Sequence, residues 1–386
     1  MRCRRIAILG STGSIGRQAL KIIEPQRYLK ACALAAGSNW RLLAEQAHAH
    51  RPEVVALCDP AGADDLARAL PPGTELLTGP DAMVELVRRA RADLVLTAMA
   101  GSSGLLPTLE AIRQGCDLAI ANKESLVMAG ALVMHAARHA KVQVLPVDSE
   151  HSAVYQCLHG HRRQDVRRVT LTASGGPFRT WPAERVAAAT LDEVLRHPTW
   201  QMGRKVTIDS ATLMNKALEI IEAHWLFELP AEQIEVVIHP ESLVHALVEF
   251  SDGSVLAQLG PPSMATPISF ALHHPRRSPR IEASSVLDLP RQGTLHFEPA
   301  EPERFPALAL GYRVLELGGT AGAILNAANE VAVEAFVAGR VRFGQILAVS
   351  AEVLNQVPVN AEVTVQSVLA ADAAARAAAE EVVARM

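Results

Sequence analysis

Three acidic side chains in two short segments could together bind a divalent metal ion. Asp148 and Glu150 stand at i and i+2 where the apolar run Val142–Val147 ends, and alternate side chains of an extended backbone share one face. Glu219 follows on a predicted helix. Carboxylate oxygens are the ligands that Mg²⁺ and Mn²⁺ prefer. The spacing therefore predicts a hard-metal site, although either Asp148 or Glu150 alone could be a polar strand end or a helix first turn.

A second set of polar side chains could bind an anion next to that metal. Ser210, Asn215 and Lys216 stand in the same segment as Glu219, and Ser174 begins a small-residue loop after a predicted strand. Such a loop can hold a phosphate through backbone N–H groups, but it could equally be a plain turn. Lys216 could lie on the solvated face of a helix. The number of such groups favours an oxyanion clamp.

Lys123 is expected at the same edge of the fold as Asp148. It follows the apolar run Leu118–Ala121, which reads as a strand. Ligands of doubly wound sheets bind at the carboxyl ends of the strands. Lys123 and Asp148 should therefore face one crevice.

A loop with bulky apolar residues could cover that crevice. The segment 197–204 reads HPTWQMGR, with Trp200 and Met202 beside Pro and Gly. An exposed Trp on a mobile loop often belongs to a lid, although Trp200 could simply pack the loop down. His197 has no partner at metal-ligand spacing, so we interpret it as a substrate or phosphate contact.

A glycine-rich turn near the N-terminus predicts a dinucleotide site. The segment Gly10–Gly16 reads GSTGSIG, follows the first predicted strand and begins a helix. Glycines there let the backbone approach a pyrophosphate, which the helix N-terminus stabilises. The spacing differs from G-x-G-x-x-G and is weak alone, but its strand–turn–helix context favours a nucleotide site over a structural turn.

The residues after the second predicted strand favour NADPH over NADH. An NAD site uses an acidic residue about twenty positions after the glycines, and no Asp or Glu occurs between Glu24 and Glu45. Ser38, Asn39 and Arg41 stand there instead. Hydroxyl, amide and guanidinium donors suit a 2′-phosphate, although Arg41 could be a solvated helix residue.

Composition narrows the class of protein. The chain has 386 residues with 37 basic and 41 acidic ones, a net charge of −4, so no basic field attracts nucleic acid. The five cysteines form no C-x-x-C pair, which predicts free thiols in a reducing compartment and no zinc site. No apolar run is long enough for a membrane span, and the first one breaks at Gly10, too early for a signal peptide. We expect a cytoplasmic protein without nucleic-acid or membrane partners.

The pattern of elements predicts an α/β protein whose N-terminal part is a doubly wound, Rossmann-type parallel sheet. Six strands are expected there, at Arg5–Leu9, Ala31–Ala36, Val54–Leu57, Leu94–Thr97, Leu118–Ala121 and Val142–Val147. We predict four parts: a nucleotide-binding domain over 1–148, a central α/β catalytic domain over 149–273, a linker over 274–300 and a helical bundle over 301–386. In the central domain, Val206–Ile208 is expected as a strand and 211–227 as a helix after an Asp209/Ser210 cap.

Seven segments together resemble one enzyme family. They are GSTGSIG (10–16), ANKE (121–124), VDSEHSA (147–153), ASGGPF (173–178), HPTWQMG (197–203), DSATLMNKALE (209–219) and IHPESLVHALVEF (238–250). In this order they are similar to 1-deoxy-D-xylulose 5-phosphate reductoisomerases. The resemblance implies an NADPH-binding Rossmann domain, a catalytic domain with a divalent metal (Mg²⁺ or Mn²⁺, with Co²⁺ as a further alternative), a C-terminal helical bundle and a homodimer.

The resemblance also implies roles for individual residues. The implied metal ligands are Asp148, Glu150 and Glu219, and the implied catalytic residues are Lys123, Glu150 and His151. The implied substrate contacts are Lys123, Ser149, Ser174, His197, Trp200, Met202, Ser210, Asn215 and Lys216. The implied cofactor contacts are Gly10, Thr12, Gly13, Ser14, Ile15, Gly37, Ser38, Asn39, Arg41, Asn122, Glu124 and Gly203. Ser38 departs from the family, many members of which have Lys there.

The implied reaction converts 1-deoxy-D-xylulose 5-phosphate into 2-C-methyl-D-erythritol 4-phosphate, in the non-mevalonate route to isoprenoids. Two alternatives remain open from the sequence. One is a dehydrogenase of the aspartate-semialdehyde type, which needs a catalytic Cys in a polar setting. The other is a non-catalytic NADP sensor, which needs neither three acids nor a phosphate clamp.

Overall fold

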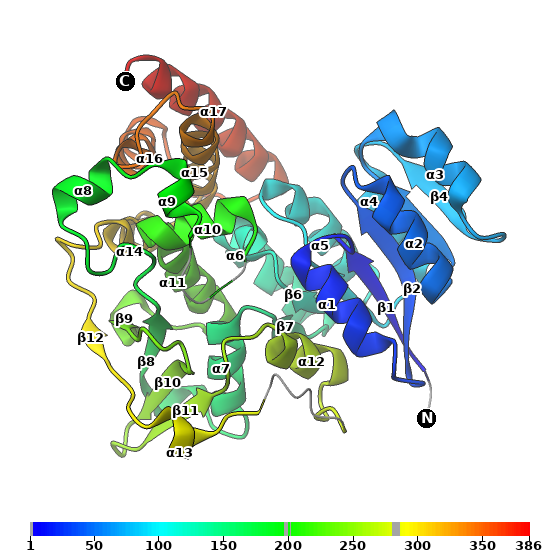
Figure 1. Ribbon diagram of the computed structural model, residues 1–386, viewed down its shortest axis with the longest axis horizontal. Coiled ribbons are helices and arrows are strands. Elements are labelled where there is room, and N and C mark those ends of the chain that lie inside the picture. The colour runs from blue at the N-terminus through cyan, green and yellow to red at the C-terminus, as the bar shows by residue number, and fades with distance from the viewer. Residues whose placement is uncertain (1–2, 197–199, 201, 280–285) are drawn as a thin grey trace. The chain divides into compact units, whose positions relative to one another are not determined.

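The chain forms two compact units, each with its own sheet (Figure 1). The computed structural model describes residues 3–196, 200, 202–279 and 286–386. Unit 1 comprises Met1–Asn122, Val133–Ser152 and Met264–Ser285, and unit 2 comprises Lys123–Leu132, Ala153–Ser263 and Val286–Met386. The domain boundaries predicted from the sequence remain a proposal.

Unit 1 contains a seven-stranded parallel sheet, which confirms the predicted fold class. The strands are β1 (Arg4–Leu9), β2 (Leu29–Ala36), β3 (Val54–Leu57), β4 (Glu75–Thr78), β5 (Leu94–Thr97), β6 (Asp117–Ile120) and β7 (Val144–Pro146), in the order β4-β3-β2-β1-β5-β6-β7. The inner strands are apolar runs with almost no exposure, as expected when helices cover both faces of a parallel sheet. The prediction missed β4, an edge strand with a half-exposed pattern.

Helices connect these strands and place the strand ends at one edge. They are α1 (Ser14–Ile23), α2 (Trp40–His50), α3 (Ala63–Ala69), α4 (Ala82–Ala90), α5 (Leu105–Arg113), α6 (Lys123–Ala140) and α7 (Ser149–Leu158). Strands β2 to β4 follow β1 on one side of the sheet and β5 to β7 lie on its other side, so the strand order reverses between β1 and β5. Ligands of doubly wound sheets bind outside the strand ends at such a point. Helix α12 (Ala265–His273) contacts α1, β6 and β7.

Unit 2 contains a mixed five-stranded sheet in the order β11-β10-β8-β9-β12. Its strands are β8 (Val166–Ala173), β9 (Ile234–Ile238), β10 (Val244–Phe250), β11 (Val255–Leu259) and β12 (Glu298–Pro299). Strands β8 and β9 are parallel, and the other pairs are antiparallel. The segment predicted as a linker thus supplies β12 and the short helix α13 (Leu289–Gln292).

The segment that carries the candidate phosphate residues is two helices. Helices α8 (Ala183–Ala187) and α9 (Leu191–Val194) precede α10 (Arg204–Thr212) and α11 (Met214–Phe227). The predicted strand Val206–Ile208 is wrong, because these residues lie within α10. The predicted helix start at 211 is also wrong: Leu213 adopts the left-handed conformation, with φ of 58°, and breaks the helix between Ser210 and Asn215.

The C-terminal part of unit 2 is helical, as predicted. It contains α14 (Ala307–Leu317), α15 (Ala321–Val337), α16 (Gln345–Gln356) and α17 (Val365–Ala384). Helix α15 is the central one, since it contacts α14, α16 and α17 and is buried along most of its length. Among the residues that the structure describes, no helix is both long and apolar enough to cross a membrane.

Candidate active site

The glycine-rich turn between β1 and α1 brings the backbone close to the neighbouring strand end. Gly10 has φ of +86°, and a Cβ there would lie 2.6 Å from the carbonyl oxygen of Ala98. A Cβ on Gly16 would overlap the carbonyl oxygen of Gly10. Gly13 precedes α1 without a capping side chain, and Gly13 and Ser14 are exposed. The first N–H groups of α1 are therefore available to a phosphate.

Two side chains that the sequence did not single out as ligands hold this turn in place. The Ser11 hydroxyl donates to Gln46 Oε1 at 2.7 Å, and Gln46 Nε2 donates back to the Ser11 carbonyl at 2.9 Å.

Asn122 Nδ2 donates to the carbonyls of Met99 and Gly101 at 3.1 and 2.9 Å. Asn122 thus fixes the backbone after β5, and this contact is a structural role in addition to the one expected for it.

The residues predicted to select the cofactor lie at the end of β2. Gly37, Ser38 and Asn39 are exposed. Asn39 caps α2, since its side chain accepts a hydrogen bond from the Leu42 N–H at 3.2 Å. The Arg41 guanidinium lies 4.6 Å from the centroid of the Trp40 ring, which holds it by a cation–π contact at the surface.

The first acidic pair lies where β7 gives way to α7. The Asp148 carbonyl accepts the N–H of Ser152 at 2.8 Å, so Asp148 caps the helix. Glu150 lies in the first turn of α7, and the Ser149 hydroxyl donates to its carboxylate. The extended backbone assumed for this pair is therefore wrong; the first-turn alternative holds for Glu150, where the helix dipole favours an acid. His151 is buried in the same turn.

In unit 2, two lysines and an amide surround the third acid. Lys123 Nζ donates to Asn215 Oδ1 at 3.0 Å and to Glu219 Oε1 at 2.9 Å. Asn215 and Lys216 also donate to the Glu219 carboxylate, whose side chain is 1% exposed. The start of α6 and the first turns of α11 thus place four of the predicted residues in one hydrogen-bonded cluster, the Glu219 cluster.

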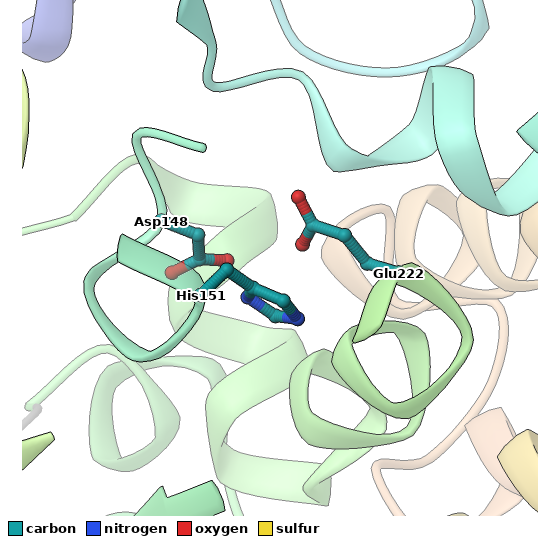
Figure 2. A group of neighbouring side chains, drawn as sticks. All are labelled: Asp148, His151 and Glu222. Atoms are coloured by element: carbon teal, nitrogen blue, oxygen red, sulfur yellow. The ribbon is translucent and has the colours of Figure 1, made fainter. Parts of the chain in front are cut away.

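The described chain contains two groups of residues with metal-ligating side chains. One is Asp148, Glu150 and Glu219, and the other is Asp148, His151 and Glu222. Figure 2 shows the second group, with Asp148 and His151 at the start of α7 and Glu222 on α11. The first group offers oxygen ligands alone and consists of the three residues expected from the sequence, whose role as metal ligands stays a prediction.

The glycine loop after β8 packs against α10. Gly175 and Gly176 have φ of +82° and +69°, and the Gly176 N–H donates to Ser174 Oγ at 3.2 Å. A Cβ on Gly176 would lie 2.9 Å from the Ser210 carbonyl oxygen. The two predicted phosphate serines therefore stand on backbone segments in direct contact.

The described part of the predicted lid contacts a buried histidine. His197 lies outside the described residues, as do 198, 199 and 201. Trp200 packs on His245, with ring centroids 6.4 Å apart, and Gly203 caps α10. His245 lies on β10 and is a functional candidate that the sequence analysis missed, since an isolated His in an apolar strand gave no spacing signal.

The Trp200 side chain should matter for substrate use and little for folding. For Trp200→Ala we expect kcat/KM for the sugar phosphate to fall at least about tenfold, because a closing lid contributes binding energy. Thermal unfolding should change by only a few degrees, since Trp200 is half-exposed. Steady-state kinetics with a melting curve test this, and an unchanged kcat/KM would remove the lid assignment.

Burial lowers the pKa of His245 to about 4, so the ring is neutral at physiological pH. Because the unfolded chain binds the proton near pH 6.5, it holds more protons than the folded chain between pH 4 and 6.5, and stability is lost as pH falls through this window. From pH 7.5 to pH 5, we expect the free energy of unfolding to fall by about 2 kcal/mol less in His245→Gln than in the native protein. Urea unfolding of both proteins at the two pH values measures it; equal losses would place the His245 pKa near its ordinary value.

Together, the glycine-rich turn on a doubly wound sheet and the Glu219 cluster define an α/β enzyme of the dinucleotide-dependent oxidoreductase class. Comparison with known proteins then identifies the family. The family model for 1-deoxy-D-xylulose 5-phosphate reductoisomerase matches residues 6–130, and two models for C-terminal domains of the same enzyme match 144–227 and 259–378. The chain belongs to the 1-deoxy-D-xylulose 5-phosphate reductoisomerase family.

Relatives and solved structures agree over nearly the whole chain. The reductoisomerase of Anaeromyxobacter dehalogenans is 50% identical over 380 residues, which is 98% of this chain and 97% of the relative. A reductoisomerase from Zymomonas mobilis in complex with NADPH is 40% identical, with a TM-score of 0.92 over 99% of both chains. A DOX-P reductoisomerase in complex with NADPH, fosmidomycin and magnesium is 37% identical, with a TM-score of 0.92 over 98% of both.

Proposed function

We propose that this chain rearranges and reduces 1-deoxy-D-xylulose 5-phosphate to 2-C-methyl-D-erythritol 4-phosphate, with NADPH and a divalent metal ion. The observation that carries the proposal is the Glu219 cluster: a buried carboxylate beside two lysines and an amide, on the segments that match the family. Membership of the family at 50% identity supports the same reaction.

The donor chemistry fits a magnesium or manganese ion. Asp148, Glu150 and Glu219 offer carboxylate oxygens alone, which a hard cation prefers to nitrogen or sulfur. The related enzyme bound to magnesium supports this choice of metal. When bound, the metal would act as a Lewis acid toward the substrate's ketone and an adjacent hydroxyl.

The phosphate end of the substrate would be held by Ser174, Ser210, Asn215 and Lys216. The Gly175–Gly176 loop keeps Ser174 against the start of the Ser210–Asn215 corner. Lys216 is buried on α11 and supplies the positive charge. Because the phosphate group itself does not react, the energy of binding it can orient the substrate and hold the lid closed. His197, Trp200 and Met202 are proposed to form that lid.

Lys123, Glu150 and His151 are proposed to act at the reacting end. Lys123 donates two hydrogen bonds within the Glu219 cluster, so it fixes the orientation of a metal ligand and of Asn215. Glu150 lies beside Ser149, a proposed substrate contact. A closed lid would exclude water from this end of the substrate, and NADPH, when bound, would supply the hydride for the reduction.

The cofactor would bind over the turn Gly10–Ile15, with its 2′-phosphate at the end of β2. The exposed N–H groups at the start of α1 favour the pyrophosphate. Ser38, Asn39 and Arg41 supply neutral and cationic donors for the 2′-phosphate. The related enzymes in complex with NADPH support this form of the cofactor. Gly37, Asn122, Glu124 and Gly203 are proposed as further contacts.

The thiol-dependent dehydrogenase is disfavoured as an alternative. Burial raises the pKa of the Cys116 and Cys157 thiols to about 11, and catalytic cysteines need a thiolate at neutral pH. All five cysteines are free, which supports the expected reducing, cytoplasmic location.

The direct test is NADPH oxidation at 340 nm by the purified protein with 1-deoxy-D-xylulose 5-phosphate, with and without Mg²⁺ or Mn²⁺. Oxidation that requires the metal and yields methylerythritol phosphate is the expected result. NADPH binding without oxidation would contradict the proposal and favour the non-catalytic sensor.

We also propose a homodimer in which β11 contributes to the interface. This edge strand has one open side, and Val255 and Leu256 are 52% and 40% exposed. Such an edge is a ready template for pairing with another chain. Sedimentation should show a dimer for the native chain and a shift toward monomer for Leu256→Lys. Exposed Leu369→Lys on α17 is the matched control and should stay dimeric.

A further inference from the structure

A charged network in unit 2 connects the helices α6, α10 and α15, and of its members only Glu124 has a proposed role, as a cofactor contact. Lys205, in the first turn of α10, lies 3.2 Å from Glu124 Oε1 on α6 and 2.9 Å from Asp209 Oδ2 on its own helix. Asn329 Nδ2 on α15 donates to the other oxygen of Asp209 at 2.9 Å. Helix α10 is therefore tied to α6 at its start and to α15 near its end.

The network is buried, so its geometry is costly to lose. The side chains of Glu124 and Asp209 are 7% and 2% exposed, and that of Lys205 is 21% exposed. Burial alone would lower the pKa of Lys205, but the charges of Asp209 and Glu124 raise it above its usual value. Lys205 is thus a cation held between two buried carboxylates, and losing one partner of such a set is strongly destabilising.

The position of Lys205 in the chain gives the network a functional meaning. Lys205 is two residues after Gly203 and three after Met202, in the segment proposed to form the lid. Its partner Glu124 directly follows Lys123, which reaches the Glu219 cluster on α11. Two adjacent residues at the start of α6 therefore contact two different helices. Lys123 contacts α11, which carries Glu219, and Glu124 contacts α10, which carries Ser210.

We propose that Lys205 is a positioning residue, which fixes the start of α10, and with it the preceding residues Met202 and Gly203, to the Glu124 carboxylate. Without this link, α10 keeps its hydrogen bond to α15 through Asp209 and Asn329. It loses the ion pair that fixes the position of its first turn relative to α6. Met202, Gly203 and Ser210 would then be displaced from the positions in which they are proposed to contact the substrate and the cofactor, and small displacements of binding groups have large effects on rate. This inference rests on the proposed function for the roles of those three residues.

Three variants of the full chain test it. Lys205→Met removes the link. Lys205→Met leaves the carboxylates of Glu124 and Asp209 without the Lys205 cation. The double variant Lys205→Met/Asp209→Asn also removes the link, but it removes the Asp209 charge as well. Arg376→Met is the matched control, because Arg376 also joins two carboxylates, at 2.8 Å from Asp372 and 2.5 Å from Glu330, but on α17 and α15.

For Lys205→Met we expect KM for the sugar phosphate to rise at least about tenfold with a smaller change in kcat, and backbone amides of 204–212 to exchange hydrogen at least about tenfold faster. The double variant should regain stability toward urea yet keep both defects. Arg376→Met should lose stability and keep native KM and native exchange in α10.

Recovery of native KM and exchange in the double variant would overturn the proposal, since Lys205 would then only neutralise charge. Unchanged exchange of α10 in Lys205→Met would overturn it as well. Hydrogen exchange needs no substrate, so it tests the anchoring role of Lys205 separately from the proposed function. If the wild-type chain lacked turnover and α10 still exchanged faster in Lys205→Met, the proposed function would be refuted and the anchoring role would remain.

Discussion

Glu219→Gln should lose turnover at least about 100-fold at saturating Mg²⁺ while NADPH binding stays native. The amide keeps the shape of the side chain but removes the charge that a divalent cation needs, and groups that hold or orient a metal typically control activity by one to two orders of magnitude or more. It also leaves Lys123 and Lys216 beside a neutral group. Metal-dependent turnover and NADPH titration, measured on one preparation, separate the two effects.

Glu222→Gln is the matched comparison, because Glu222 lies on the same helix, is equally buried and belongs to the second group of metal-ligating types. If the proposed oxygen set is right, Glu222→Gln keeps the native dependence on Mg²⁺. The opposite pattern, with Mg²⁺ dependence lost in Glu222→Gln and kept in Glu219→Gln, would move the metal to the group of Asp148, His151 and Glu222 (Figure 2).

Gly16→Val should weaken NADPH binding at least about 100-fold. Even the Cβ of a substituted residue 16 would overlap the Gly10 carbonyl oxygen, so α1 must move away from the turn that would hold the pyrophosphate. Overpacking of this kind also costs about 1–3 kcal/mol of stability. Calorimetric titration with NADPH, on protein shown to be folded by circular dichroism, measures the affinity.

Arg17→Val controls for the β-branched side chain, since Arg17 is the next residue of α1 and is exposed. Its helix-propensity cost is below about 1 kcal/mol, and its NADPH affinity should stay within a few-fold of native. Native affinity in Gly16→Val would mean that the cofactor does not bind over this turn.

The fold of unit 1 was predictable because burial on both faces makes parallel strands read as short apolar runs. Val54–Leu57 and Leu94–Thr97 match their predicted bounds. The strand β4 has two exposed end residues and two partly exposed middle residues, and it is not such a run. Val206–Ile208 was mistaken for a strand since β-branched residues favour strands locally, whereas the contacts that make this segment helical come from α6, α11 and α15.

Residues at strand ends could be placed from sequence, and contacts between helices could not. Lys123 and Asp148 follow strands, and the parallel topology fixes where strand ends lie. His245 and Lys205 gave no such signal. His245 becomes a candidate only through its contact with Trp200. Lys205 becomes one only through its contacts with two carboxylates, one of which is 81 residues away in the chain. The site roles themselves came from the resemblance, and they stay predictions.

The left-handed residue between α10 and α11 limits which substitutions, insertions and deletions this corner can accept. A buried Leu213 with φ of 58° accepts about 1–2 kcal/mol of backbone strain to turn one helix into the next within a single residue. Adding or deleting one residue there would rotate Asn215, Lys216 and Glu219 by about 100° around the axis of α11. Replacement of Leu213 by Gly would relieve this strain, but the loss of its buried side chain would cost about 2–5 kcal/mol. Both the length of this corner and the residue at position 213 are therefore constrained.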